Sequence, residues 1–293
     1  MPLLGQDLFG ALSHRVAILG PGLIGGSLAM ALRRAGALWD ISVWARREEA
    51  ACEAAPLLHG CHVSHNLASV ASHCDIAVLC MSPHAIQASG PSLKKILPAS
   101  AAITDAGSVK SAIVHALEKV FGGRFIGAHP MAGSEQSGIL AAREDLYDRA
   151  VCILTPTPAT NPDALDLVAE MWRAAGCGLR ELSPAAHDRA IARISHLPHA
   201  AAASLVHAAA GADPGAVEFA GAGYRDSTRI AGGPEDLWAE ILLDNSNQVL
   251  AGIRDLQTAL DTLKMALETG NRSAVEAFLS DARRLRAISP NVP

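Results

Sequence analysis

The fold of this chain is decided by one stretch near its start, Arg15-Val16-Ala17-Ile18-Leu19-Gly20-Pro21-Gly22-Leu23-Ile24-Gly25. Residues 26–36 follow with the apolar pattern of a helix that ends at a glycine. Strand, glycine loop and helix in this order are the setting in which Gly-x-Gly-x-x-Gly binds a dinucleotide. Gly20 permits the tight turn, Gly22 lets the pyrophosphate approach, and Gly25 lets helix and strand pack closely. We therefore predict cofactor contacts at Gly20, Gly22, Leu23, Ile24 and Gly25.

The end of the next strand bears on the choice of cofactor. Proteins selective for NAD carry an Asp or Glu there, which binds the ribose hydroxyls. This chain has Arg46 and Arg47 instead, and arginine suits a 2′-phosphate. NADP is therefore our preferred prediction, although NAD fits if Arg46 stacks on the adenine and Glu48 binds the ribose. Ser82 ends the buried strand at residues 75–81 and is expected near the nicotinamide.

Strand and helix signals alternate along the first part of the chain. Further strands are expected at residues 101–105, 125–127, 151–154 and 178–182, and a helix at residues 162–175. Ser108 is positioned to cap the helix that follows the strand at residues 101–105. The pattern predicts an α/β fold with a Rossmann-type, doubly wound and mostly parallel sheet, in a dinucleotide-binding domain of residues 1–182.

Strand signals stop after Ser183-Pro184, so residues 183–293 are predicted to form an all-α domain. Helices are expected at residues 185–210 with a break at Leu197-Pro198, at residues 234–268, and from a cap at Ser273 to about residue 288. The long helix carries a wide apolar stripe that invites a partner helix and indicates a homodimer: Leu237, Ile241, Leu242, Val249, Ile253, Leu256, Leu260 and Leu263.

A second glycine-rich stretch, residues 127–138, combines His129 and Glu135 with three glycines and a proline. Such punctuation argues against a regular helix or a central strand. We predict a loop at the carboxyl end of a strand, where ligands bind in open α/β sheets. His129 and Glu135 then suggest chemistry, and the alternative is a tight turn with two solvated polar side chains.

Two polar clusters interrupt the alanine-rich helices. Residues 221–233 are either a linker in which Asp226 pairs with Arg229, or an anion-binding insert in which Arg225 and Arg229 each bind a carboxylate. Ser195-His196-Leu197-Pro198-His199 forms the other cluster, and its histidines are more often packed or solvated residues than ligands.

Composition narrows the class of protein. Of the 293 residues 50% are hydrophobic, the formal net charge is −5, and no block of basic residues predicts a nucleic-acid surface. No signal peptide or membrane-spanning stretch is found, so a cytoplasmic protein is expected. Six cysteines without a Cys-x-x-Cys pair are expected to be reduced, buried thiols. Twelve histidines without metal-ligand spacing predict no metal site.

Three motifs taken together resemble the prephenate/arogenate dehydrogenase family of tyrosine biosynthesis. They are Thr104-Asp105-Ala106-Gly107-Ser108-Val109-Lys110, Gly127-Ala128-His129-Pro130-Met131-Ala132-Gly133-Ser134-Glu135, and Gly223-Tyr224-Arg225-Asp226-Ser227-Thr228-Arg229-Ile230-Ala231. The Ser195–His199 cluster also matches. The resemblance implies a nucleotide-binding domain followed by a helical dimerisation domain. The acidic residue that many NAD-using members carry after the second strand is absent, and no appended regulatory domain or fused mutase is expected.

The resemblance also implies roles for single residues. His129 is the expected catalytic base near the ring hydroxyl, and Ser108 bonds the same hydroxyl or orients His129. Arg229 is expected to bind the ring carboxylate, and Arg225 and His199 the side-chain end. Ser134, Glu135 and Asp226 complete the expected substrate contacts. The implied reaction is oxidative decarboxylation of prephenate or L-arogenate with hydride transfer to NAD(P)+.

Two other functions remain open at this stage. A β-hydroxyacid or imine oxidoreductase shares the glycine loop and a helical second domain, but Lys264, the only lysine of the helical half, is poorly placed for catalysis. A nucleotide-binding redox sensor needs neither His129 nor the arginines. The choices between prephenate and L-arogenate, and between NADP and NAD, also remain open.

Overall fold

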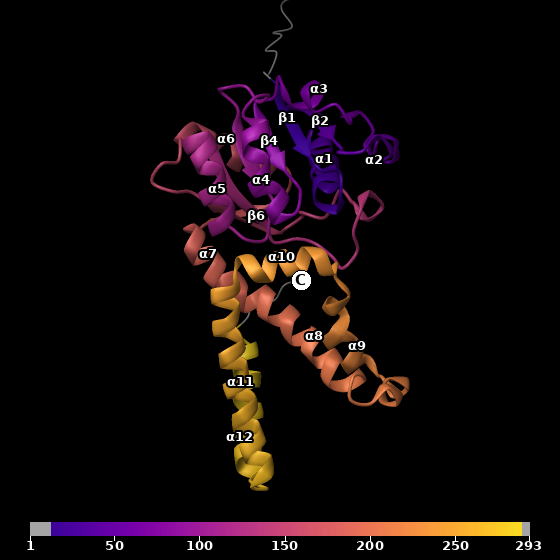
Figure 1. The fold of residues 1–293 in the computed structure, drawn as a ribbon, viewed down its shortest axis with the longest axis vertical. Helices are drawn as coiled ribbons and strands as arrows, with labels where there is room; N and C mark the ends of the chain where they lie inside the picture. The colour runs from indigo at the N-terminus through magenta and orange to yellow at the C-terminus, as the bar shows by residue number, and fades with distance from the viewer. Residues whose placement is uncertain (1–12, 289–293) are drawn as a thin grey trace, which may run out of the picture.

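The structure is a computed structural model, and it describes residues 13–288. Residues 1–12, in which we expect no signal peptide, and residues 289–293, at the end of the predicted helical domain, lie outside the described residues. Figure 1 shows two parts, a sheet flanked by helices and a purely helical part below it. We call them the sheet half and the helical half.

Eight strands form one sheet in the order β3-β2-β1-β4-β5-β6-β7-β8. All neighbouring strands are parallel except β6 and β7. The prediction of a Rossmann-type, mostly parallel sheet is therefore confirmed, and β3 is a strand that the sequence analysis missed. The strands are β1 (His14–Leu19), β2 (Trp39–Trp44), β3 (His62–Ser64), β4 (Ile76–Leu79), β5 (Ala102–Asp105), β6 (Phe125–Pro130), β7 (Val151–Thr155) and β8 (Gly178–Glu181).

Helices cover both faces of the sheet because the strands are apolar on both sides. In β1, Val16 and Ile18 pack into one core and Ala17 and Leu19 into the other. The first core includes side chains of α1 (Leu23–Ala35), α2 (Glu48–Ala54) and α6 (Pro162–Ala174). The second includes α3 (Leu67–Ala71), α4 (Pro83–Leu93) and α5 (Ser111–Phe121). Because β1 to β6 run parallel, their carboxyl ends lie at one edge of the sheet.

Strand β6 corrects the prediction for residues 127–138. Residues 127–130 belong to this strand, which lies inside the sheet between β5 and β7, and the loop starts only at Met131. Pro130 is tolerated because it is the last residue of the strand. Gly127 is required for packing, since an added Cβ would lie 2.3 Å from Oγ1 of Thr155 on β7. His129 is consequently held by a central strand and not by a loop.

The helical half begins where the sheet ends. Its helices are α7 (Pro184–Ile191), α8 (Leu197–Ala210), α9 (Ala222–Thr228), α10 (Glu235–Asp244), α11 (Ser246–Glu268) and α12 (Arg272–Arg286). Between α7 and α8 the backbone forms a π-helical turn, Ala192–His196, just before the break predicted at Leu197-Pro198. In Figure 1, α10 lies against the sheet half, while α11 with α12 and α8 with α9 extend away as two arms.

Two helix boundaries differ from the prediction. The long helix is divided at Asn245, a buried residue whose side chain donates to the backbone carbonyl of Asp188 on α7 at 2.8 Å. The last helix is capped by Asn271, whose side chain accepts from the N–H of Ala274 at 3.1 Å, and not by Ser273. Apolar periodicity continues across Asn245, so the division has no signal in the hydrophobic pattern.

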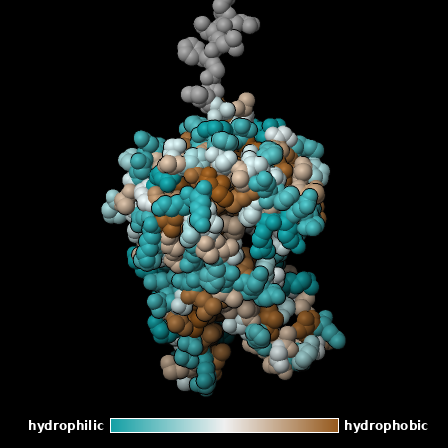
Figure 2. Space-filling model, turned by 45° about the horizontal axis from the view of Figure 1, so that its top comes forward, coloured by the Kyte–Doolittle hydropathy of each residue, from teal (hydrophilic) through white to brown (hydrophobic). Residues whose placement is uncertain are grey.

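The arm formed by α11 and α12 keeps much apolar surface exposed. Six side chains on it are each more than half exposed: Leu250, Leu260, Met265, Leu267, Leu279 and Leu285. Figure 2 shows hydrophobic residues on both arms of the helical half. Among residues 13–288 no helix is long and apolar enough to cross a membrane.

The cysteines and histidines form neither bridges nor a metal cluster in the described part of the chain. All six cysteines are free. Cys74, Cys152 and Cys177 are buried, but Cys52 is exposed, so the prediction that all the thiols are buried was wrong there. Within residues 13–288, no group of three His, Cys, Asp or Glu side chains is arranged to hold a metal ion.

Candidate active site

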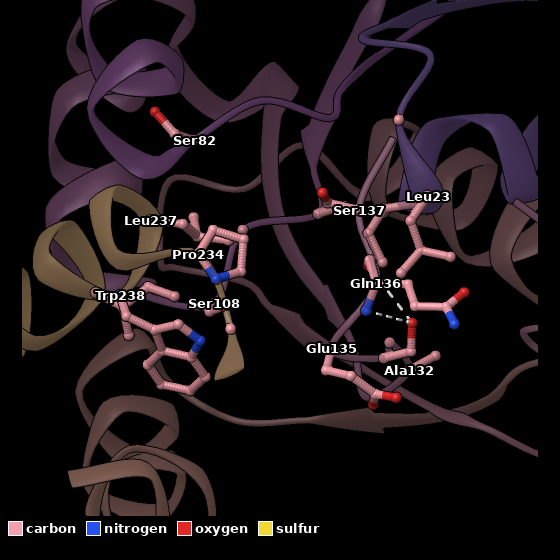
Figure 3. Close-up of a pocket in the computed structure, with 18 of the residues that line it drawn as sticks. Leu23, Ser82, Ser108, Ala132, Glu135, Gln136, Ser137, Pro234, Leu237 and Trp238 are labelled. Carbon is pink, nitrogen blue, oxygen red and sulfur yellow. Dashed lines mark hydrogen bonds between the residues drawn. The ribbon is translucent and has the colours of Figure 1, made fainter. Parts of the chain in front are cut away.

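A cavity of about 660 Å³ lies between the carboxyl edge of the sheet and the helical half. The sheet half contributes the glycine loop, Ser82, Ser108, His129 and the loop of residues 131–138. The helical half contributes Arg229 and the first turn of α10. Figure 3 shows Pro234, Leu237 and Trp238 on one side of this space and Glu135 and Gln136 on the other. The cavity therefore collects polar groups from both halves.

The glycine loop fits the pyrophosphate of a dinucleotide. Gly20 has a φ of +116°, and a Cβ there would lie 2.2 Å from the carbonyl oxygen of Cys80. A Cβ at Gly25 would lie 2.0 Å from the carbonyl oxygen of Gly20. Gly22 has no atom within 4 Å of an added Cβ and lines the cavity, as do Leu23 and Ile24. The N-terminus of α1 thus opens onto free space, with no side chain capping it.

Arg46 and Arg47 follow the end of β2, at the outer side of the glycine loop. The N–H of Gly20 donates to the carbonyl of Trp44 at 2.9 Å, which joins the loop to this strand. Both arginines are exposed, and neither lines the cavity. Glu48, the nearest following carboxylate, is in the first turn of α2. Both arginines are thus exposed beside the strand that bonds to the glycine loop.

His129 is held at the bottom of the cavity by groups from both halves of the molecule. Its Nδ1 lies 2.8 Å from Nε2 of His187 on α7, and Nδ1 of His187 lies 2.9 Å from Oδ1 of Asp188. All three side chains are buried. Burial, with His187 and Lys110 nearby, lowers the pKa of His129 well below its ordinary value, so the ring is neutral. Neutral imidazole is the form that can accept a proton.

A buried ion pair supports the strand that carries His129. Nζ of Lys110 donates to Oδ2 of Asp105 and, at 2.9 Å, to the carbonyl of Ala128. Oδ1 of Asp105 accepts from the N–H of Ala128 at 3.0 Å. Both charged side chains are completely buried. The backbone next to His129 is therefore fixed from β5 and from the start of α5.

The start of α5 corrects another prediction, because Ser108 is not its cap. The helix begins at Ser111, and the carboxylate of Asp188 accepts from the N–H groups of Lys110 at 2.8 Å and Ser111 at 2.9 Å. A residue of the helical half thus caps a helix of the sheet half. Ser108 instead lines the cavity, as His129 does.

At the entrance of the cavity, Nη1 of Arg229 donates to Oε2 of Glu135 at 2.8 Å. The alternative in which Asp226 pairs with Arg229 is therefore wrong, because Arg229 pairs with Glu135. Arg225 donates to the carbonyl of Ala220 at 2.8 Å, and neither Arg225 nor Asp226 lines the cavity. Ser134 does line it, and its Oγ accepts from the N–H of Gln136 at 3.1 Å.

His199 lies behind the wall of the cavity. Its ring stacks on Trp238 with centroids 3.5 Å apart and planes 12° from parallel. His199 is buried, and among the described residues its Nδ1 has no hydrogen-bond partner. Trp238 lines the cavity in its place, and sequence reasoning missed it. In the sequence, Trp238 is an aromatic residue near the start of a predicted helix, and nothing local indicates that it lines a cavity.

The neighbouring His196 joins the same buried network. Its Nδ1 lies 3.2 Å from the side-chain nitrogen of Asn245. Burial lowers the pKa of His196 to about 4, so this ring is neutral as well. His187, Asp188 and Asn245 were all missed, because α7 and the junction of α10 and α11 lie far apart in the sequence and form no local motif.

Two family models match consecutive parts of the chain. "Prephenate dehydrogenase, nucleotide-binding domain" matches residues 28–180, and "Prephenate dehydrogenase, dimerization domain" matches residues 183–281. These two ranges include His129 and Arg229 respectively.

Curated and solved proteins agree with the family models. Prephenate dehydrogenase of Bacillus subtilis is 35% identical over 63% of this chain, and the match spans about half of the relative's length, 51%. Cyclohexadienyl dehydrogenase of Zymomonas mobilis is 28% identical over 92% of this chain and 94% of its own. The solved prephenate dehydrogenase of A. aeolicus, in complex with hydroxyphenyl propionate and NAD+, has a TM-score of 0.86 and 31% identity, covering 94% of this chain and 97% of its own.

Proposed function

The chain belongs to the prephenate dehydrogenase family, and from this we propose that it oxidatively decarboxylates prephenate or L-arogenate with a nicotinamide dinucleotide as hydride acceptor. One observation carries the proposal. His129 from the sheet half and Arg229 from the helical half line the same cavity, onto which the glycine loop opens. A redox sensor without a substrate would need neither of these two side chains there.

His129 is the proposed catalytic base. The proposed substrate is a non-aromatic ring that carries a hydroxyl, a ring carboxylate and a side chain with a second carboxylate. The cofactor, when bound, supplies the hydride acceptor. His129 is neutral and accepts the hydroxyl proton as the ring carbinol becomes a carbonyl. Carbon dioxide then leaves, its electron pair enters the ring and makes it aromatic, and the ring oxygen regains a proton. The protein's main tasks are therefore to align the substrate and to hold that proton.

Arg229 is the proposed partner of the ring carboxylate. Its guanidinium forms an ion pair with a carboxylate of the protein, that of Glu135. A substrate carboxylate would take the same place and gain charge-assisted hydrogen bonds. Ser108, which lines the cavity as His129 does, is proposed to bond the substrate hydroxyl. Since Arg225, Asp226 and His199 do not line the cavity, we propose no direct substrate contact for them.

NADP is the proposed preferred cofactor. Arg46 and Arg47 are exposed at the end of β2, where a carboxylate would favour NAD. We expect kcat/KM to be higher for NADP+ than for NAD+. Replacing both arginines with alanine should raise KM for NADP+ by about tenfold or more and leave KM for NAD+ nearly unchanged, because only NADP+ carries the 2′-phosphate. Equal loss with both cofactors would assign the arginines to the adenine.

We propose that the chain forms a homodimer. Within each chain, the boundary between the dinucleotide-binding domain and the helical domain is proposed to lie between residues 182 and 183. The second family model describes a dimerisation domain, and β8 ends at Glu181 shortly before α7 begins at Pro184. The exposed apolar side chains on α11 and α12 support a partner there. Light scattering of the purified protein should give twice the chain mass.

We also propose a cytoplasmic location, as expected for biosynthesis of an amino acid.

The direct test is an absorbance assay of NAD(P)H formation by the purified protein. Prephenate and L-arogenate would each be supplied with NADP+ and with NAD+. We expect turnover of at least one substrate, with carbon dioxide and the aromatic product formed in equal amounts. Absence of turnover with all four combinations, in protein that binds the cofactor, would refute the proposed reaction.

A further inference from the structure

The buried side chains behind His129 form a continuous line of hydrogen bonds. Nδ1 of His129 meets Nε2 of His187 at 2.8 Å, and Nδ1 of His187 meets Oδ1 of Asp188 at 2.9 Å. The line crosses from β6 to α7 and thus from the sheet half to the helical half. It ends at Asp188, whose carboxylate accepts two backbone N–H groups of the first residues of α5.

The chemistry of Asp188 determines which nitrogen carries the proton all along this line. Burial alone would raise the pKa of Asp188, but hydrogen bonds from His187, Ser111 and Lys110 hold it at about 2. The group is therefore a carboxylate, which only accepts hydrogen bonds. Nδ1 of His187 must then donate, and because this ring is neutral its Nε2 must accept.

The same hydrogen bonds determine the tautomer of His129, the proposed base. If Nε2 of His187 accepts, Nδ1 of His129 must carry the hydrogen that it receives. A neutral His129 ring then has its lone pair on Nε2, the nitrogen that does not contact His187. His129 lines the cavity, so this free nitrogen is the one available to a substrate. The opposite tautomer would leave two hydrogen-bond acceptors facing each other at 2.8 Å.

We propose that His187 and Asp188 are positioning residues that fix His129 in the tautomer with Nδ1 protonated and Nε2 free to accept the substrate's proton. The inference rests on the proposed function for its catalytic meaning. Asp188 cannot turn away, because the N–H groups of Lys110 and Ser111 hold both of its oxygens. Lys110 also fixes Ala128, the residue before His129. Lys110 and His196 are the other titratable groups that act on His129.

We call this line of three side chains, Asp188, His187 and His129, the relay, because each fixes the protonated nitrogen of the next. Kinetic measurements on two His187 variants test it. His187→Leu removes the acceptor, whereas His187→Gln can offer its amide oxygen to Nδ1 of His129. Because a buried N–H without a partner is disfavoured, the leucine variant should shift His129 to the wrong tautomer and lower kcat by about 10- to 100-fold. The glutamine variant should keep kcat within about tenfold of the wild type and above the leucine variant. KM for substrate and cofactor should change by less than about threefold in both.

Exposed His115 on α5 provides the matched control. His115→Leu and His115→Gln should keep the wild-type kcat. A His187→Leu enzyme with wild-type kcat, or one whose loss appears only in KM, would overturn the relay.

A direct reading of the tautomer separates this inference from the proposed function and does not require turnover. In protein labelled with ¹⁵N-histidine, the signals of His129 and His187 are assigned by their absence in His129→Asn and His187→Gln. The relay requires protonated Nδ1 and unprotonated Nε2 in both rings of the wild type without substrate. Protonated Nε2 on His129 would overturn it, even if the leucine variant failed to fold. If the tautomers are as expected but neither prephenate nor L-arogenate is oxidised, the proposed function fails and the relay stands.

Discussion

Two ion pairs flank the cavity, one at its floor and one at its mouth. We call the buried cluster behind the cavity the floor; it consists of Asp105, Lys110, His129, His187 and Asp188, of which His129 lines the cavity, and its Lys110–Asp105 pair is completely buried. The mouth consists of Ser134, Glu135 and Arg229, and the side chains of its Arg229–Glu135 pair are 58% and 41% exposed. Buried charges are tolerated only with full partnering, whereas exposed pairs exchange partners at little cost. The floor thus holds one fixed arrangement around the proposed base, and we expect the mouth to release Arg229 to an incoming carboxylate.

The largest expected effect is the loss of His129 from the floor. His129→Asn removes the base but keeps a polar side chain of similar reach. Since general-base catalysis contributes about 10²- to 10⁴-fold, kcat should fall by that factor, while cofactor binding measured by fluorescence titration stays nearly unchanged. His115→Asn, on the exposed face of α5, is the control. Full activity of His129→Asn would remove this residue from the mechanism.

Removing Lys110 should break the floor as a folded unit. Lys110→Met leaves the charge of Asp105 buried without its partner, which should lower the free energy of unfolding by about 3–5 kcal/mol. The measurement is urea unfolding followed by circular dichroism. Lys119→Met, an exposed lysine in the last turn of the same helix, should cost less than about 1 kcal/mol. Similar losses in the two variants would mean that the floor is not held by its ion pair.

The floor and the neighbouring His196 also predict how the free energy of unfolding depends on pH. Burial lowers the pKa of His129, His187 and His196, the last to about 4, whereas unfolded histidine titrates near ~6.5. Between these values the unfolded chain binds more protons, so stability should fall as the pH falls from ~6.5 to ~4. His196 alone accounts for about 3 kcal/mol. Urea unfolding at several pH values measures this slope, and a flat profile would contradict neutral, buried rings.

Asp188 extends the loss of stability to lower pH. Its pKa is held at about 2, below the ordinary value of a carboxyl near ~3.9. The stability it contributes is present above the ordinary pKa and is lost as the pH falls through the lowered one. The mouth should add little, because Glu135 and Arg229 are exposed and solvent screens them.

Sequence reasoning identified the architecture because that information is local. Short stretches of sequence are enough to recognise the glycine loop, the apolar strands and the point where strand signals stop. The observed sheet confirms the predicted Rossmann-type architecture. Residues 127–130 were misread because glycine and proline usually end strands, whereas here Gly127 avoids a clash with Thr155 and Pro130 closes the strand. The helix break at Asn245 was missed because a side chain that bonds to another helix leaves no mark on hydrophobic periodicity.

The mouth and the floor of the candidate site also differ in how far their residues could be predicted from local sequence motifs. Ser134, Glu135 and Arg229 of the mouth were named from their motifs, and all three line the cavity. His187 and Asp188 of the floor were not, although they contact His129 and the start of α5. They are separated from His129 by 58 residues or more, within an alanine-rich helical region. The only available signal was a His-Asp pair in the first helix after the sheet, and its partners depend on how the halves pack.

At the mouth, Arg229→Ala should weaken substrate binding. Loss of a charge-assisted hydrogen bond corresponds to about 10- to 100-fold in KM for the substrate, and KM for the cofactor should change by less than about twofold. Arg189→Ala, an exposed arginine on α7, is the control for a changed surface charge. An unchanged substrate KM would count against the assignment of Arg229 to the substrate carboxylate. A large drop in the free energy of unfolding would show that the Arg229–Glu135 pair is structural, as the Lys110–Asp105 pair is.

The smallest expected effect separates an exchangeable pair from a structural one. Glu135→Gln removes the charge that competes with the substrate for Arg229. Because exposed ion pairs contribute about 0–1 kcal/mol, the free energy of unfolding should hardly change, while KM for the substrate should fall by about two- to fivefold. This gain should shrink at high salt, which screens exposed charges, and it should vanish in the Arg229→Ala background. Glu170→Gln on the outer face of α6 controls for net charge. A higher KM in Glu135→Gln would mean that Glu135 itself holds the substrate, and the mouth would then bind its ligand with both members of the pair.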